Sequence, residues 1–96
     1  MRLEWTRFAL MDREKIFEYI LRDNPHAAVD MDIDISEQTA ILIDFPESGR
    51  LGRIAGTREL VINRTPYIVA YRIDGDIVRI FRVLHGAQAW PDELQT

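Results

Sequence analysis

The sequence predicts one α+β domain with the element order β-α-α-β-β-β: a short N-terminal strand, a two-helix hairpin and a three-stranded antiparallel meander. Three observations predict it. Residues 1–48 contain no glycine and repeat apolar residues at helical spacing, residues 46–56 are rich in glycine and arginine, and the following segments are β-branched and aromatic. A chain of 96 residues suits a single folding unit over 1–96. Two helices packed on one face of a small sheet would bury its core.

The N-terminal part predicts a strand followed by a helix. Residues 2–5 alternate Leu3 and Trp5 like a short edge strand, and Trp5 is expected to pack on the core. Thr6 is the expected N-cap of a helix that continues toward Asn24, since no glycine or proline intervenes. The spacing assigns Ala9, Ile16, Tyr19 and Ile20 to the inner face of this helix, and Asp12, Glu14, Lys15 and Glu18 to its outer face.

A second helix is predicted to begin at Asn24-Pro25, a capping residue followed by proline at the first helical position. It should stop near Phe45-Pro46. Asp30, Asp32 and Asp34 alternate with apolar residues as in a strand, but the cap and the lack of glycine favour a helix with a solvated acidic face. The helical period is kept by Ala28, Met31, Ile35, Gln38 or Thr39, and Leu42.

Residues 46–56 are predicted to form a loop, and three strands are expected after it. The strands are Arg58–Ile62, Tyr67–Ile73 and Ile77–Leu84, with a two-residue turn at Asp74-Gly75. That turn would place Ile73 opposite Asp76, Tyr71 opposite Val78, Val69 opposite Ile80, and Tyr67 opposite Arg82. Both faces then mix apolar residues with arginine, so the pattern leaves open which face the helices cover.

Composition and charge exclude several classes of protein. The absence of cysteine excludes disulfide frameworks, thiol nucleophiles and thiolate zinc sites, and makes the cytoplasm the expected compartment. No apolar run is long enough for a membrane span, and no signal peptide is visible. The net charge of -4 argues against binding to bulk phosphate. Residues 1–48 carry 11 acidic and 5 basic residues, whereas residues 49–96 carry 7 arginines and 5 acidic residues.

Arginine and histidine in the second half are the candidates for chemistry. Without a metal-binding histidine pair or a glycine pattern for phosphates, no metal site and no cofactor is expected. Arginines converging with His85 could bind a phosphodiester and shuttle a proton during 2′-hydroxyl attack. The alternative is favoured by the spacing: the arginines lie on a solvated or partner-covered face, and His85 only ends a strand. The residues concerned are Arg50, Arg53, Arg58, Tyr67, Tyr71, Arg72, Arg79, Arg82 and His85.

Several blocks, in order along almost the whole chain, resemble toxins of the RelE/ParE superfamily of bacterial type II toxin–antitoxin systems. They are Trp5-Thr6, Ile16-Phe17-Glu18-Tyr19-Ile20, Asn24-Pro25-x-Ala27-Ala28, Phe45-Pro46-x-x-Gly49-Arg50-x-Gly52-Arg53, Gly56-Thr57-Arg58-Glu59-Leu60-Val61, Pro66-Tyr67-Ile68-Val69-x-Tyr71 and Arg82-Val83-Leu84-His85-x-x-Gln88-x-Trp90-Pro91. The resemblance implies a growth-inhibiting toxin associated with plasmid stabilisation. It also implies a cognate antitoxin that wraps around the toxin, with a higher-order complex of the two as an expectation.

The superfamily offers two activities, and the fold alone does not choose between them. One branch cleaves mRNA on the ribosome; there the resemblance assigns Arg58, Arg79, Arg82 and His85 as catalytic candidates. The other branch inhibits DNA gyrase without cutting nucleic acid. We favour the gyrase branch, because the chain is net acidic and its closing Arg-Val-Leu-His fits that branch at least as well. Antitoxin or target contacts are expected from Arg50, Arg53, Arg72, Tyr67 and Tyr71.

Overall fold

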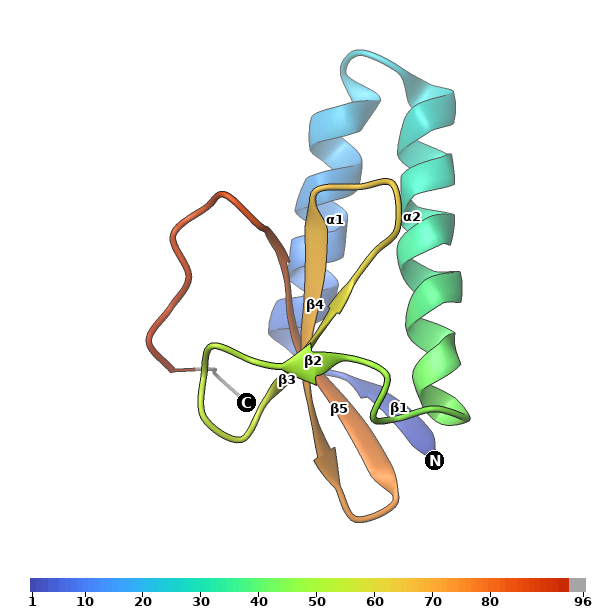
Figure 1. The fold of residues 1–96 in the computed structure, drawn as a ribbon. Helices are drawn as coiled ribbons and strands as arrows, with labels where there is room; N and C mark the ends of the chain where they lie inside the picture. Colours follow the sequence, from blue (N-terminus) through green and yellow to red (C-terminus); the bar gives the residue numbers. More distant parts are fainter. Residues whose placement is uncertain (94–96) are drawn as a thin grey trace.

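A hairpin of two long helices lies against one face of a five-stranded sheet (Figure 1). The computed structural model describes residues 1–93. The strand order in the sheet is β1-β5-β4-β3-β2. Along the chain the elements are β1 (Arg2–Trp5), α1 (Arg7–Leu21), α2 (Pro25–Ala40), the 3-10 turn η1 (Ile41–Ile43), β2 (Arg50–Leu51), β3 (Arg58–Val61), β4 (Tyr67–Asp74) and β5 (Ile77–His85). The α+β architecture predicted from the sequence is therefore confirmed.

Both helices begin at the caps that the sequence indicates. The Thr6 hydroxyl accepts a hydrogen bond from the Ala9 N–H at 3.2 Å, and the Asn24 side-chain oxygen accepts one from the Ala27 N–H at 3.1 Å. Pro25 occupies the first turn of α2, where its missing N–H leaves no hydrogen bond unmade. The capping residues therefore determine where each of the two helices begins.

The sheet is mixed rather than purely antiparallel. β1 pairs in parallel with β5, placing Leu3 opposite Val78, and the other neighbouring strands are antiparallel. The segment predicted as a loop contains a further strand, β2, in which Arg50 lies opposite Glu59. Two residues are too few to show the alternation that predicts a strand, so the pattern missed β2.

The predicted hairpin register is wrong, because the two-residue turn lies one residue later than the predicted Asp74-Gly75. The turn residues are Gly75 and Asp76, so Asp74 rather than Ile73 begins the pairing and lies opposite Ile77. Gly75 adopts a φ of +59°, which glycine reaches without the steric cost of a Cβ atom. The turn therefore forms where glycine occupies its first position.

A bulge shifts the register again in the middle of the hairpin. Tyr71 lies opposite Ile80, but Ala70 lies opposite Arg82, so Phe81 is the extra residue on β5. Beyond the bulge Tyr67 lies opposite His85, where a continuous register had predicted Arg82. The bulge also decides which side chains of the terminal strand share a face.

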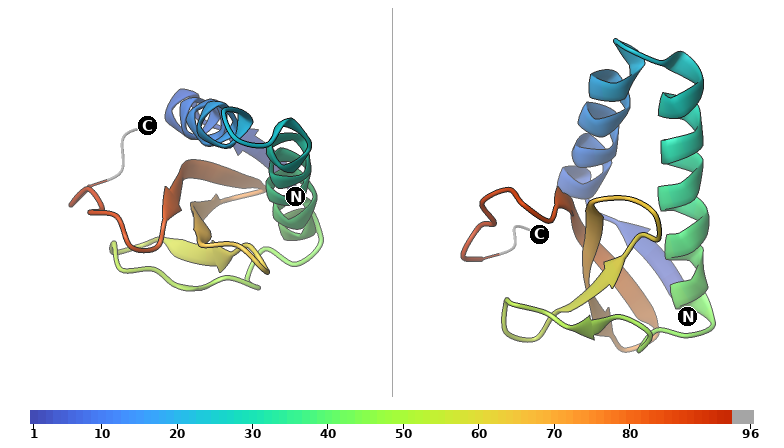
Figure 2. Two further views of the ribbon diagram at one scale, coloured as in Figure 1. Left: turned by 90° about the horizontal axis from the view of Figure 1, so that it is seen from above. Right: turned by 45° about the horizontal axis from the view of Figure 1, so that its top comes forward.

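The main core lies between the helical hairpin and the sheet. The left view of Figure 2 shows both helices on one side of β4 and β5, with the segment that carries β2 on the other. Val69 and Tyr71 of β4 face the helices, which answers the question that the mixed pattern left open. Tyr19, predicted as a core residue, is 69% exposed, because the tip of the hairpin extends beyond the strands (Figure 1). The core consists of Ala9, Ile35, Leu42, Ile62, Val69, Tyr71, Val78, Ile80 and Val83.

The opposite sheet face is also covered. Ile68, Ala70, Phe81 and Leu84 are buried there, and the Arg72 guanidinium lies 5.2 Å from the centroid of the Phe81 ring. Neither face of β4 and β5 is therefore a bare apolar surface. Within residues 1–93, no helix has the length and apolarity needed to cross a membrane.

Tyr71 ties the loop before β2 to the core. Its ring is fully buried, its hydroxyl donates to the Pro46 carbonyl at 2.7 Å, and it accepts the Gly49 N–H at 2.9 Å. A Cβ atom on Gly49 would lie 2.6 Å from this hydroxyl, so the contact requires glycine. The expectation that Tyr71 contacts a partner is corrected: its side chain belongs to the core.

We expect Tyr71→Phe to lower the free energy of unfolding by about 1–3 kcal/mol, because the Gly49 N–H and the Pro46 carbonyl lose their shared partner. Urea unfolding followed by circular dichroism measures this. Tyr19→Phe, at an exposed tyrosine, is the matched control and should leave the midpoint unchanged. Equal stability of the two variants would contradict the role given to the Tyr71 hydroxyl.

Candidate functional site on the arginine-bearing sheet

The register divides the candidate catalytic residues between the two faces of the sheet. Cross-strand partners share a face, so Arg82 lies with Ala70, and Arg79 with Arg72, on the face away from the helices. His85, three residues after Arg82, lies on the helix side opposite Tyr67. The register therefore starts the Arg79 and Arg82 side chains from one sheet face and the His85 side chain from the other, but the Arg82 guanidinium reaches α1, where it pairs with Asp12, and Arg79 pairs with Glu4 and Asp74 instead.

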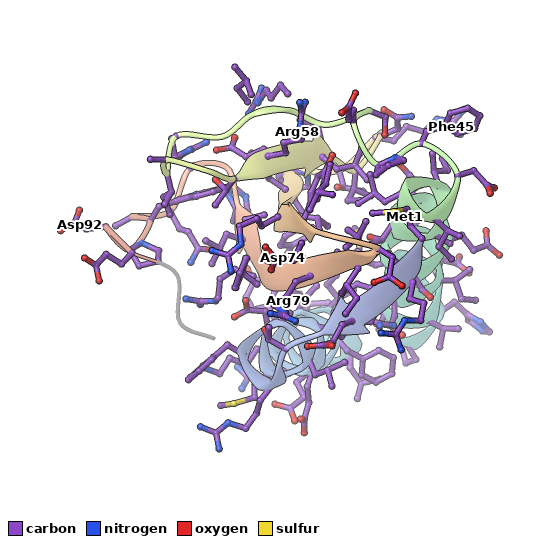
Figure 3. The ribbon with its side chains drawn as sticks, turned by 90° about the horizontal axis from the view of Figure 1, so that it is seen from below. Met1, Phe45, Arg58, Asp74, Arg79 and Asp92 are labelled. Carbon is purple, nitrogen blue, oxygen red and sulfur yellow. The ribbon has the colours of Figure 1, made fainter. Side chains whose placement is uncertain are left out.

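Arg58 is also separated from Arg79 and Arg82. It lies opposite Tyr71, on the helix-side face of β3. Figure 3 shows Arg79 beside Asp74, whereas Arg58 lies apart from both on β3. Its Nη1 donates to the Gly49 carbonyl at 2.9 Å and to the Glu47 carbonyl at 3.4 Å. Arg58 therefore stabilises the loop before β2.

Arg82 is held by a carboxylate from the first helix. Its Nε donates to Asp12 Oδ2 at 2.6 Å and its Nη2 donates to Asp12 Oδ1 at 3.0 Å. Asp12 is buried, so its predicted position on the outer helix face is wrong. Hydrogen bonding to Asp12 raises the pKa of Arg82 above its ordinary value, despite the opposing effect of burial. The geometry is the bidentate pairing that guanidinium and carboxylate favour.

Asp12 also closes the edge of the sheet. β1 ends opposite Ile80, so the next residues of β5 pair with β4 on one side and have no strand on the other. The Thr6 hydroxyl donates to the Phe81 carbonyl at 3.0 Å, and the Val83 N–H donates to Asp12 Oδ2 at 2.9 Å. The first turns of α1 thus satisfy backbone groups that would otherwise form an open edge. The same carboxylate fixes both the strand and Arg82.

A second ion-pair group occupies the sheet beside β1. Arg79 donates from Nε to Glu4 at 3.1 Å and from Nη1 to Asp74 at 3.4 Å. Arg72 donates from Nε to the other oxygen of Asp74 at 2.9 Å. Two arginines therefore share two carboxylates, and their positive charge is balanced within the chain.

Glu59 forms the third group, with two arginines of the loop. Glu59 is only 3% exposed and accepts from the side chains of Arg50 and Arg53 and from the Arg53 backbone N–H at 2.8 Å. Burial by itself raises the pKa of Glu59, but these hydrogen bonds outweigh it and hold the pKa below the ordinary value of 4.5. The structure therefore gives Arg50 and Arg53, both expected at a partner surface, a shared partner inside the chain.

Trp90 packs on this third group. The Arg53 guanidinium lies 3.7 Å from the centroid of the Trp90 ring, and the indole N–H donates to the His85 carbonyl at 3.3 Å. Trp90 therefore stacks on a cation of this group. Trp5, in contrast, does pack on the core, with Arg13 4.7 Å from its ring centroid.

His85 has local partners only. Its Nδ1 accepts the Ala87 N–H at 3.0 Å, so the neutral ring carries its proton on Nε2. Tyr67 meets the ring edge-on, with 5.7 Å between centroids. Burial, with a smaller effect of Tyr19, raises the pKa of Tyr67, which keeps its hydroxyl protonated at neutral pH. Among residues 1–93, no carboxylate forms a hydrogen bond or ion pair with His85.

The described residues offer no set of ligands for a metal ion. Within residues 1–93, no three His, Asp or Glu side chains gather in a way that could hold a metal ion. The arrangement on the sheet instead consists of three groups in which arginines pair with carboxylates, centred on Asp12, Asp74 and Glu59; Arg50 and Arg53 share the single negative charge of Glu59. Of these carboxylates, Asp12 carried a signal in the sequence: it lies three residues after Ala9 and four before Ile16, on their helical face.

Replacing Asp12 by alanine should lower the free energy of unfolding by about 3–5 kcal/mol, because Arg82 and the Val83 N–H both lose a buried partner. Glu18→Gln, at an exposed carboxylate of the same helix, should have little effect. Chemical denaturation of both variants checks this. A loss in Asp12→Ala no larger than that in Glu18→Gln would show that Asp12 does not hold the strand.

Glu59 should make stability depend on acid pH. Its folded-state pKa lies below its unfolded-state value, so its contribution is complete above about pH 4.5 and is lost as the pH falls through the folded-state pKa. We expect Glu59→Gln to be less stable at neutral pH and to lose less stability on acidification. Thermal melts from pH 7 down to pH 3 measure both slopes, and parallel slopes would contradict the assignment.

Comparison with known proteins identifies the family of this chain. The family model described as "ParE toxin of type II toxin-antitoxin system, parDE" matches residues 3–90. Y4kP of Sinorhizobium fredii, named as a candidate toxin, is 44% identical over 93 residues, which are 97% of this chain and 96% of that protein. Toxin RelE2 of Caulobacter vibrioides is 37% identical over 84 residues, 88% of this chain and 93% of that one.

A solved structure agrees with the sequence relatives. The chromosomal ParDE TA system from P. aeruginosa contains a chain that superposes with a TM-score of 0.80 at 30% identity, over 86% of this chain and 92% of that chain. The match to the family model covers nearly all of the described residues, from β1 to Trp90. On these grounds the chain belongs to the ParE toxin family of type II toxin–antitoxin systems, within the RelE/ParE superfamily that its sequence resembles.

Proposed function

We propose that this type II toxin arrests growth by inhibiting DNA gyrase, and that it acts in the cytoplasm until its cognate antitoxin neutralises it. The observation that carries the proposal is the division of the candidate nuclease residues. Arg79 and Arg82 start from one sheet face and His85 from the other, and each bonds a different partner: Arg82 bonds Asp12 of α1, Arg79 bonds Glu4 and Asp74, and His85 accepts the Ala87 N–H. A general acid or base must come within hydrogen-bond reach of the atoms that react, beside the groups that stabilise the charge.

The pairing of the arginines supports the same conclusion. To stabilise a phosphorane, Arg82 would have to leave Asp12, with which it forms two hydrogen bonds, and Asp12 would then remain buried without its cation. Arg79 would likewise have to leave Glu4 and Asp74. These costs, together with the net charge of -4, disfavour binding of mRNA to this face.

The alternative is ribosome-dependent cleavage of mRNA. It needs His85 as the proton carrier, and among residues 1–93 the ring forms no hydrogen bond or ion pair with a carboxylate or a guanidinium. Gyrase inhibition requires no proton transfer by His85, which then serves only as the last residue of β5. The two activities therefore make opposite demands on this residue.

The purified toxin is expected to inhibit ATP-dependent supercoiling by gyrase, and added antitoxin should reverse the inhibition. His85→Ala should inhibit within about twofold of the unchanged protein, because gyrase inhibition without cutting of nucleic acid requires no proton carrier at that position. Supercoiling gels and growth curves measure the two effects, with circular dichroism to confirm folding. The proposal fails if a growth-arresting preparation leaves gyrase active, cuts ribosome-bound mRNA, and loses the cutting in His85→Ala.

A further inference from the structure

The loop that joins η1 to β2 exposes the ring of Phe45. This side chain is 65% exposed and projects from the edge of the molecule in Figure 3, away from Asp74 and Arg79. Ile41 lies one turn earlier, its carbonyl accepts the Phe45 N–H at 2.9 Å, and it is 49% exposed. Single exposed apolar residues are normal on a protein surface, but neighbouring ones mark contact sites. We call Ile41 and Phe45 the loop patch.

An open hollow lies beside the Phe45 ring. Its volume is about 440 Å³, and it is lined by Asp44, Phe45, Pro46, Glu47 and Ser48. This volume lies within the range of pockets that receive ligands in proteins. A partner that accepts the Phe45 ring can therefore place a side chain of its own in the hollow, so that the two surfaces interlock.

Hydrogen bonds hold the backbone at Phe45 and after it. The Phe45 carbonyl accepts the Ser48 hydroxyl at 2.8 Å and the Ser48 N–H at 3.1 Å. The Pro46 carbonyl accepts the hydroxyl of the buried Tyr71 at 2.7 Å, and Arg58 bonds two further carbonyls of the same loop. Because the loop is fixed before a partner arrives, docking of the ring requires little ordering of the chain. Tyr71 and Arg58 are therefore positioning residues for Phe45.

The charge around the loop patch is negative. Asp44 and Glu47 are exposed on either side of Phe45, and Glu37 is exposed one turn before Ile41. Between Glu37 and Glu47 the chain has neither lysine nor arginine. Within residues 1–93, none of these three carboxylates forms an ion pair. A partner that matches this surface needs an apolar cleft with basic residues beside it.

We propose that the loop patch docks into an apolar cleft of DNA gyrase that is rimmed by lysine or arginine, with Phe45 as the anchor. An enzyme that acts on DNA must present clusters of these two residues to the phosphates. The carboxylates beside Phe45 are complementary in charge to such a rim. This inference rests on the gyrase target proposed above, and it adds which part of the toxin makes the contact.

Charge disfavours two other occupants of the loop patch. In a two-fold contact with a second copy, the same surface meets itself, so Asp44 and Glu47 would face their own equivalents. Nucleic acid would bring phosphates against the same carboxylates. A protein surface with basic residues around an apolar cleft fits both the exposed ring and the charges.

The apolar part of the proposal is tested with Phe45→Ala in the full chain, with purified gyrase holoenzyme as the probe. We expect surface plasmon resonance to give an affinity at least about 30-fold weaker, because an aromatic anchor carries much of the binding energy of a contact. Inhibition of supercoiling should weaken in parallel. Tyr19→Ala is the matched control, an aromatic residue 69% exposed at the tip of the helical hairpin, and its affinity should stay within about twofold. Thermal melts verify that both variants fold.

The electrostatic part is tested with Asp44→Lys combined with Glu47→Lys. Reversing these charges should weaken gyrase binding about tenfold at low ionic strength and less at high salt, because exposed charges are screened. Glu18→Lys combined with Asp23→Lys makes the same change of net charge near the tip of the hairpin, and it should leave the affinity within about twofold.

The outcomes separate this inference from the gyrase target itself. If the unchanged toxin binds and inhibits gyrase, unchanged affinity of either patch variant overturns the inference and leaves the gyrase target standing. If a growth-arresting preparation of the unchanged toxin neither binds nor inhibits gyrase, both fail. Calorimetry with the purified antitoxin and sedimentation of the free toxin test the other occupants. Loss of antitoxin affinity, or dissociation of a toxin dimer, in a Phe45→Ala variant that still binds gyrase normally also overturns the inference.

Discussion

The carboxylate of Asp12 is the contact on which the arrangement of this toxin depends. β1 accompanies β5 only as far as Ile80, and the remaining strand would offer an open edge. Asp12 accepts the Val83 N–H there and holds Arg82 with two further hydrogen bonds. One side chain thus joins the first helix to the last strand, across about 70 residues of sequence. The orientation of the helical hairpin on the sheet follows from this junction.

Carboxylates also hold arginines elsewhere on the sheet, and this pairing bears on function. Carboxylates at Asp12, Asp74 and Glu59 pair with arginines that would otherwise form a more strongly basic surface. Such a surface is suited to hold its own loops and strands together rather than to attract phosphate. The second helix, in contrast, carries four acidic residues, of which Asp32 is paired with Arg13. This distribution of charge is one of the grounds for the proposal that the target is a protein rather than RNA.

Sequence reasoning succeeded where the deciding signal is local. The caps at Thr6 and Asn24 and the β-branched strands depend on a few neighbouring residues, and these predictions are confirmed. The bulge at Phe81 has no local signal, yet it decides which residues share a face with Arg82. Asp12 was assigned outward because it is charged, although its spacing from buried neighbours indicated the inner face. Contacts between residues far apart in the sequence, such as Arg82 with Asp12, decide which side chains meet at a site. They depend on tertiary packing, which the local pattern does not encode.

The measurement that tests this account most directly is hydrogen exchange at Val83 and at the Arg82 side chain, followed by NMR in the free toxin. If Asp12 closes the strand edge and holds Arg82, the Val83 amide and the Arg82 Nε–H should exchange as slowly as core amides such as that of Val69. Exchange of both groups as fast as in the exposed turn at Asp76 would contradict the account. It would mean that the edge is open and that Arg82 is free to bind a ligand.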